Sequence, residues 1–128
     1  MNRIQVYCYY DLDIEIQLKG TPDGLRELAS LLRHPPAEAK LPEAPPTSYP
    51  AFLTHVSVRL ADTKFTLSVA SKTLIISGGQ QFLETFARNC LYMANKDVHP
   101  RGDHIHEEYY PDHPYISKES LTCIISII

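Results

Sequence analysis

The feature that most constrains the fold is a run of alternating residues near the start of the chain. Every even position from Ile4 to Leu18 is apolar or aromatic, while the odd positions are mostly polar or charged. A period of two residues is typical of a β-strand with one buried face. Because strands usually contain about five or six residues, we expect a break near Asp11–Asp13 that gives two strands sharing one face. One long bent strand is the alternative.

Two later segments have the pattern of amphipathic helices. Thr21 and Pro22 suit the start of the first, because a threonine hydroxyl can cap a helix and proline fits its first turn. Core-facing leucines follow at helical spacing until Arg33-His34-Pro35-Pro36 ends the helix: Leu25, Leu28, Leu31 and Leu32. The second helix is expected near Gln80–Asn95, and its apolar face would cover a sheet. That face contains Phe82, Leu83, Phe86, Ala87, Cys90, Leu91 and Ala94.

The remaining apolar segments alternate as strands do. Leu53–Leu60, Phe65–Val69 and Leu74–Ile76 are joined by links short enough for an antiparallel meander, and Ile105–Tyr110 and Leu121–Ile127 supply two final strands. The order β(β)αβββαββ predicts one α+β domain over residues 1–128. We expect a mostly antiparallel sheet of about six strands with both helices on one face. Pro35–Pro50 holds six of the ten prolines and is expected to be a loop.

Composition and charge exclude several classes of function. Lys and Arg are scattered in a chain of net charge −3, so we expect no nucleic-acid partner. No apolar run is long enough to cross a membrane, and Met1–Tyr10 does not resemble a signal peptide, which predicts a cytoplasmic protein. Cys8, Cys90 and Cys123 lie among apolar neighbours and are expected to be buried, reduced thiols. The common nucleotide, hydrolase and metalloprotease motifs are missing, and we expect no cofactor.

The most unusual stretch is the acidic, tyrosine-containing tract between Asp103 and Glu119. It carries five acids against Lys118 alone, so its net charge is −4 and that of the remainder is about +1. Tyrosines anchor many protein interfaces, and surrounding acids suit a basic partner. The expected contact residues are Asp103, Glu107, Tyr109, Tyr110, Asp112 and Tyr115. Of these, we expect Glu107, Tyr109, Asp112 and Tyr115 to face outward.

The same tract allows other interpretations. On a strand, His104, His106 and Glu108 would share a face and could hold zinc or iron(II), which would make the protein a small metal-dependent enzyme. Pro111 and Pro114 could instead simply build a turn between the last strands. A third alternative is a homo-oligomeric scaffold, such as a homodimer, with the long first strand as its pairing edge.

The sequence also resembles a known family at two places. Asp-His-Ile-His-x-Glu-Tyr-Tyr-Pro-x-His-Pro-Tyr-Ile-Ser-x-x-Ser, from Asp103 to Ser120, is similar to the signature of a bacterial polymorphic-toxin immunity family. The strand that runs into Gly20-Thr21-Pro22-Asp23-Gly24-Leu25 resembles an earlier segment of that family, and Leu121-Thr122-Cys123 departs from its pattern. The resemblance implies a non-enzymatic α+β protein that binds and neutralises a cognate toxin.

Overall fold

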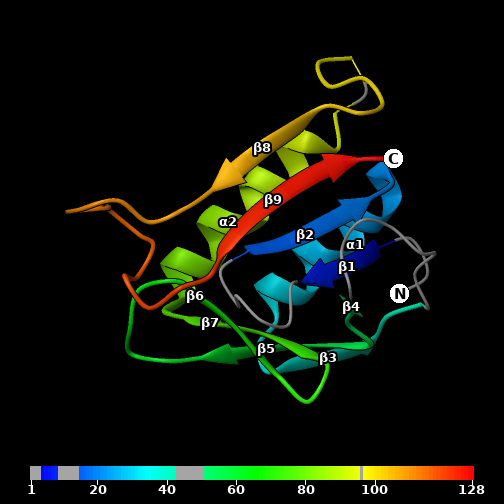
Figure 1. Cartoon of the computed structure of the whole chain (residues 1–128). Coiled ribbons are helices and arrows are strands. Elements are labelled where there is room, and N and C mark those ends of the chain that lie inside the picture. Colours follow the sequence, from blue (N-terminus) through cyan, green and yellow to red (C-terminus); the bar gives the residue numbers. More distant parts are fainter. Residues whose placement is uncertain (1–3, 9–14, 43–50, 96) are drawn as a thin grey trace.

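The computed structural model describes residues 4–8, 15–42, 51–95 and 97–128, and this part of the chain forms two sheets and two helices (Figure 1). The first sheet, sheet A, contains in order β4 (Ala51–Phe52), β1 (Ile4–Cys8), β2 (Glu15–Gly20), β9 (Thr122–Ile127) and β8 (His104–Glu107). The second, sheet B, contains in order β3 (Ala37–Lys40), β5 (His55–Leu60), β7 (Thr73–Gly78) and β6 (Thr66–Ala70).

The alternating N-terminal run forms two strands, as predicted. β1 and β2 pair antiparallel, and their even-numbered apolar residues are buried in the core: Ile4, Val6, Ile16 and Leu18. The expected break near Asp11–Asp13 lies outside the described residues. β1 is flanked by β2 and β4, so it is not available as a pairing edge and that route to a homo-oligomer is wrong.

Both predicted helices are confirmed, as α1 (Pro22–Arg33) and α2 (Gln80–Met93). The Thr21 hydroxyl caps α1 by accepting the amide N–H of Gly24 at 3.1 Å. The predicted stripe on α1 is buried except at Leu31, which is partly exposed. Within the described part of the chain, neither helix is long and apolar enough to span a membrane.

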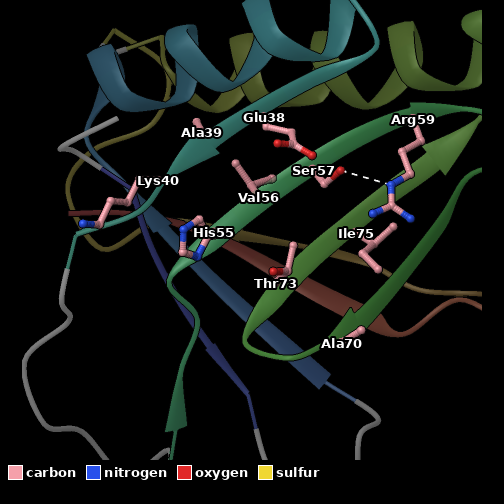
Figure 2. Close-up of a pocket in the computed structure, with 10 residues that line it drawn as sticks. All are labelled: Glu38, Ala39, Lys40, His55, Val56, Ser57, Arg59, Ala70, Thr73 and Ile75. Carbon is pink, nitrogen blue, oxygen red and sulfur yellow. Dashed lines mark hydrogen bonds between the residues drawn. The ribbon is translucent and has the colours of Figure 1, made fainter.

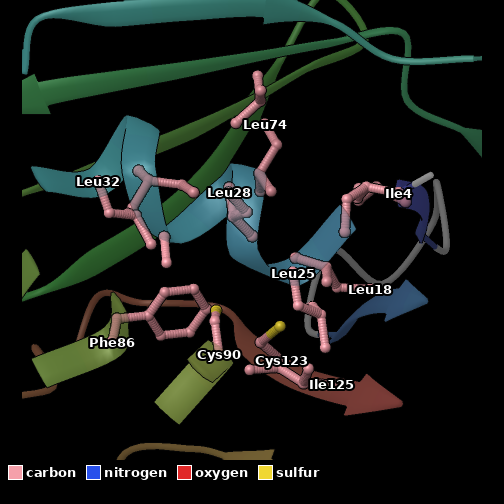
Figure 3. Packing of buried hydrophobic residues seen from close by; sticks show 14 of the residues in the cluster. Ile4, Leu18, Leu25, Leu28, Leu32, Leu74, Phe86, Cys90, Cys123 and Ile125 are labelled. Carbon is pink, nitrogen blue, oxygen red and sulfur yellow. The ribbon is translucent and has the colours of Figure 1, made fainter. Parts of the chain in front are cut away.

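The helices pack side by side and contact both sheets, which corrects the prediction of one sheet covered on one face. α1 touches β2 and β3, and α2 touches β9 and β7. Figure 3 shows Leu74 of sheet B on one side of α1 and Ile125 of sheet A, beside α2, on the other. A single apolar core fills the space between these elements because each helix buries residues toward both sheets.

The predicted meander is also wrong in its pairing. β5 and β7 are parallel neighbours, and β6 lies outside β7. The chain after β5 therefore crosses the end of β7 before it returns through the Ser71-Lys72 hairpin, where both residues have positive φ. Gly78 permits this crossing, because a Cβ atom there would lie 3.1 Å from Cα of Phe65.

The proline-rich segment is not wholly a loop. Its residues 37–40 form β3, the edge strand beside β5, and residues 43–50 lie outside the described part of the chain. Cys90 and Cys123 are buried free thiols, as predicted, and both appear in the core in Figure 3. The side chain of Cys8 lies outside the described structure.

The packing of α2 generates a direct test of the core. Phe86 is fully buried, and its ring stacks on Phe65 with a centroid separation of 4.5 Å. We expect Phe86→Ala to lower the free energy of unfolding by about 3–5 kcal/mol, because it removes a large side chain and leaves a cavity. Urea denaturation of the wild type and the variant measures the difference. A loss below about 1 kcal/mol would contradict the described packing.

Candidate protein-interaction surface

The acidic tract leaves sheet A after β8 and runs along the edge of sheet B before it enters β9. Backbone hydrogen bonds join Phe65 to Tyr115 at 2.8 Å and to Ser117 at 2.9 Å. The Ser120 hydroxyl accepts the amide N–H of Leu67 at 2.8 Å, and the amide of Leu121 donates to the Leu67 carbonyl at 3.0 Å. These bonds cover the edge strand β6 and connect the two sheets.

His113 fixes the conformation of the tract from inside. Its side chain is buried, and Nδ1 accepts the amide N–H groups of Tyr115 at 3.1 Å and Ile116 at 3.0 Å. Its carbonyl accepts Nζ of Lys64 at 2.7 Å. Burial, with a smaller contribution from the Lys64 charge, lowers the pKa of His113. A neutral ring with its proton on Nε2 fits these contacts, because Nδ1 must remain an acceptor.

Glu107 is the second internal anchor, and its predicted outward orientation is wrong. The carboxylate lies on the inner face of β8, where it accepts the Asn89 side-chain amide and the Tyr115 hydroxyl. The Asn89 amide also lies 3.2 Å from the Tyr115 oxygen, so Tyr115 too faces inward rather than outward. Burial raises the pKa of Glu107, although both hydrogen bonds oppose the rise. The physical reason is that Ile105 and Glu107 share the face of β8 that packs toward the core.

Residues 108–112 form a continuous exposed segment of the tract, which we call the acidic tip. It contains Glu108, Tyr109, Tyr110, Pro111 and Asp112, all exposed. Tyr109 is 38% exposed and Tyr110 54% exposed. Figure 1 shows the chain after β8 projecting beyond the body of the molecule.

A tight turn shapes the acidic tip. The amide of His113 donates to the Tyr110 carbonyl at 3.0 Å, and Asp112 has a φ of 64°. Proline at the second position of a turn and a positive φ at the third are typical of a type II turn. The Tyr110 ring rests near the His113 ring, with centroids 4.3 Å apart. The tip is therefore held in one shape by its own anchor.

The structure divides the six predicted contact residues into three groups. Tyr109, Tyr110 and Asp112 lie together in the acidic tip, and Glu107 and Tyr115 lie beneath it in the buried network. Asp103 lies before β8, at the opposite end of that strand, where it accepts Nδ1 of His99 at 2.5 Å. That hydrogen bond lowers the pKa of Asp103. Sequence reasoning missed His113 and Asn89, whose roles depend on contacts with other elements.

In the described part of the chain, the three residues of the alternative metal site are not brought together. His104 and His106 do share the outer face of β8, and their ring centroids are 5.4 Å apart. Glu108 follows the end of the strand and does not join them. Across the described ranges, no three His, Cys, Asp or Glu side chains are grouped closely enough to hold a metal ion.

The raised pKa of Glu107 predicts a pH dependence of stability. A carboxyl whose pKa is higher in the folded than in the unfolded chain binds its proton more tightly when folded. Glu107 therefore stabilises the folded chain most below its ordinary pKa of 4.5, and this stabilisation is lost as the pH rises through its raised pKa. We expect Glu107→Gln, which keeps one acceptor and one donor in place, to gain stability relative to the wild type as pH rises.

Denaturation of both proteins between about pH 4 and pH 8, a range that spans an ordinary and a raised carboxyl pKa, measures this difference in the free energy of unfolding. Glu108→Gln is the matched control, because Glu108 is exposed and next to Glu107 in the sequence. If the difference in the free energy of unfolding between the wild type and Glu107→Gln stayed constant with pH, burial would not disfavour the charged form of Glu107.

Comparison with known proteins finds one family. The family model described as Immunity protein 32 matches residues 15–38 and 73–127, together more than half of the chain. The matched parts include β2, α1, α2 and the whole acidic tract with its two anchors. No curated protein and no solved structure matches the chain.

Proposed function

This chain belongs to the Immunity protein 32 family, and from this we propose that it binds and neutralises a cognate bacterial toxin in the cytoplasm without catalysing a reaction. The observation that carries the proposal is the acidic tip, an exposed pair of tyrosines flanked by Glu108 and Asp112 on a rigid base. The family match supports the class of partner, and the geometry supports this surface as the contact.

The acidic tip has the chemistry of an interface anchor. Tyrosine offers a large amphipathic surface with few rotatable bonds, so it loses little conformational entropy on binding. Because His113 and the Tyr110 turn already hold the tip in shape, binding needs little further ordering of the backbone. These features favour a tight contact from a small number of residues.

The charge of the tip indicates the kind of toxin surface that it would meet. Glu108 and Asp112 form no ion pair within the described structure, so both carboxylates are available to a partner. Complementary charge increases the rate of encounter and selects against partners of the wrong sign. We therefore expect a basic patch on the toxin, with Lys or Arg side chains near pockets for the two tyrosines.

The two described thiols, Cys90 and Cys123, do not suit covalent catalysis. Burial raises the pKa of both Cys90 and Cys123 far above the physiological range, which keeps them as neutral thiols. A thiol of this kind is a poor nucleophile because the thiolate is the reactive form.

Truncation of a tip tyrosine tests the proposed contact. We expect Tyr110→Ala to weaken binding to the toxin by about 2 kcal/mol or more, mainly through faster dissociation, if Tyr110 is an interface anchor. The partner would be captured from the native host and binding measured by surface plasmon resonance. Tyr92→Ala is the matched control, because Tyr92 is also 54% exposed but lies on α2. Equal rates for the two variants would place the contact elsewhere.

Neutralisation of Asp112 tests the role of charge separately from the shape of the turn. We expect Asp112→Asn to slow association with the toxin and to leave the fold intact, since asparagine tolerates the positive φ of this position. Added salt should slow the association of the wild type and reduce the difference in association rate between the wild type and Asp112→Asn. Association rates that do not respond to either change would exclude electrostatic steering by the tip.

A further inference from the structure

A second surface feature lies on the outer face of sheet B, opposite the core. A groove there has a volume of about 390 Å³ and is lined by residues of all four strands. Figure 2 shows these residues. Most of these residues, such as Ser57, Arg59 and Ile75, alternate along their strands with buried core residues. Neither helix covers this face, because both pack against the other side of the sheet (Figure 2).

The groove is basic at both ends, in a chain whose net charge is −3. Arg59 lies at one end, and Lys40 and His55 lie at the other (Figure 2). Glu38 is the only acid among the described residues that line it. The positive charge of this groove is therefore opposite in sign to the charge of the acidic tip.

Arg59 is oriented for a carboxylate. Its Nε donates to the hydroxyl of Ser57 at 3.1 Å, and Ser57 is only 3% exposed. Within the described structure no hydrogen bond or ion pair joins the two terminal nitrogens of the guanidinium to an acceptor, so they remain available. A guanidinium fixed in this way pairs well with an incoming carboxylate, and the serine hydroxyl hydrogen can join the same contact.

The floor of the groove suits an aromatic ring. Ile75 and Thr73 of β7 are half-buried, and Ala70 of β6 contributes only a methyl group. Small and apolar floor residues leave space for a flat side chain, and the neighbouring Arg59 can contact the face of a tyrosine ring. The groove thus offers a place for an aromatic residue beside a place for an acid.

We propose that the groove receives the acidic tip of a second copy of this chain. The tip supplies the two chemical groups that the groove accommodates, namely exposed carboxylates and tyrosine rings. No ion pair joins Arg59 to the tip of its own chain in the described structure, where the tip is held by His113 and projects from the body (Figure 1). Since each copy carries both a tip and a groove, two reciprocal contacts close a symmetric dimer.

This pairing has a consequence for the proposed function, on which this part of the inference rests. A tip that occupies the groove of a second copy is hidden from the toxin. The dimer is then a resting form, and the toxin competes with self-association for the same residues. Dilution and added salt both favour the monomer with its tip exposed, because the contact is charged and bimolecular.

A charge-swap experiment on the 128-residue chain, without toxin, tests the pairing. Sedimentation velocity over a concentration series would compare the wild type with Arg59→Glu, with Glu108→Arg and with the double variant. We expect dimers of the wild type, at least about tenfold weaker association of each single variant, and recovery in the double variant, because like charges repel and the swapped pair attracts again. Arg101→Glu, an exposed reversal outside the groove, is the matched control and should dimerise as the wild type does.

The outcomes separate this inference from the toxin proposal. A wild type that stays monomeric up to its solubility limit, or a double variant that is folded but fails to recover, overturns the pairing. Unchanged dimerisation of Arg59→Glu also overturns it, since the copies would then meet at another surface. Toxin binding is measured on the same variants: Arg59→Glu should keep it, whereas Glu108→Arg should lose it if the tip is the toxin contact.

Discussion

The parallel pairing of β2 with β9 is the contact on which the rest of the architecture depends. It runs from Glu15 opposite Thr122 to Gly20 opposite Ile127, so it joins the beginning and the end of the chain in one sheet. A parallel pair cannot be closed by a short turn, and the whole intervening chain acts as its connection. The middle segments must therefore build their own sheet, and the helices fill the space between the two sheets.

The acidic tract is shaped by the same constraint. The chain between β8 and β9 makes a detour to the edge of sheet B, and along the way it must satisfy its backbone groups outside a regular sheet. His113 accepts two amides of the tract, and the Ser120 hydroxyl accepts the amide of Leu67 in β6 and donates to the carbonyl of Leu121. The Glu107, Asn89 and Tyr115 side chains form a buried network beneath. The rigid base of the tip is thus a by-product of the connection between the sheets.

The positions of the helices and strands could be predicted from the sequence better than the pairing of the strands. Alternation and helical spacing located β1, β2 and both helices because those signals are local. The parallel pairs β2 with β9 and β5 with β7 depend on contacts far apart in the sequence, which periodicity does not report. For β8, alternation separated Ile105 and Glu107 from His104 and His106 but did not identify the inner face. The apolar side chain of Ile105 indicates that its face of β8 points inward. The charged Glu107 on the same face made that inference uncertain, because a carboxylate is usually exposed.

The tip and the groove differ in how they relate to the family. The family model covers the acidic tip and its anchors, whereas it passes over residues 39–72, which supply Arg59, His55 and Ser57. A toxin contact carried by the tip is therefore expected of other members that keep the same tract. The basic residues of the groove, Lys40, His55 and Arg59, lie outside the matched ranges, and two of them belong to β5. The outer face of β5 is free to vary because the core holds its inner residues, such as Val56 and Val58. Substitutions on the outer face of sheet B can thus change that surface without disturbing either the core or the acidic tip.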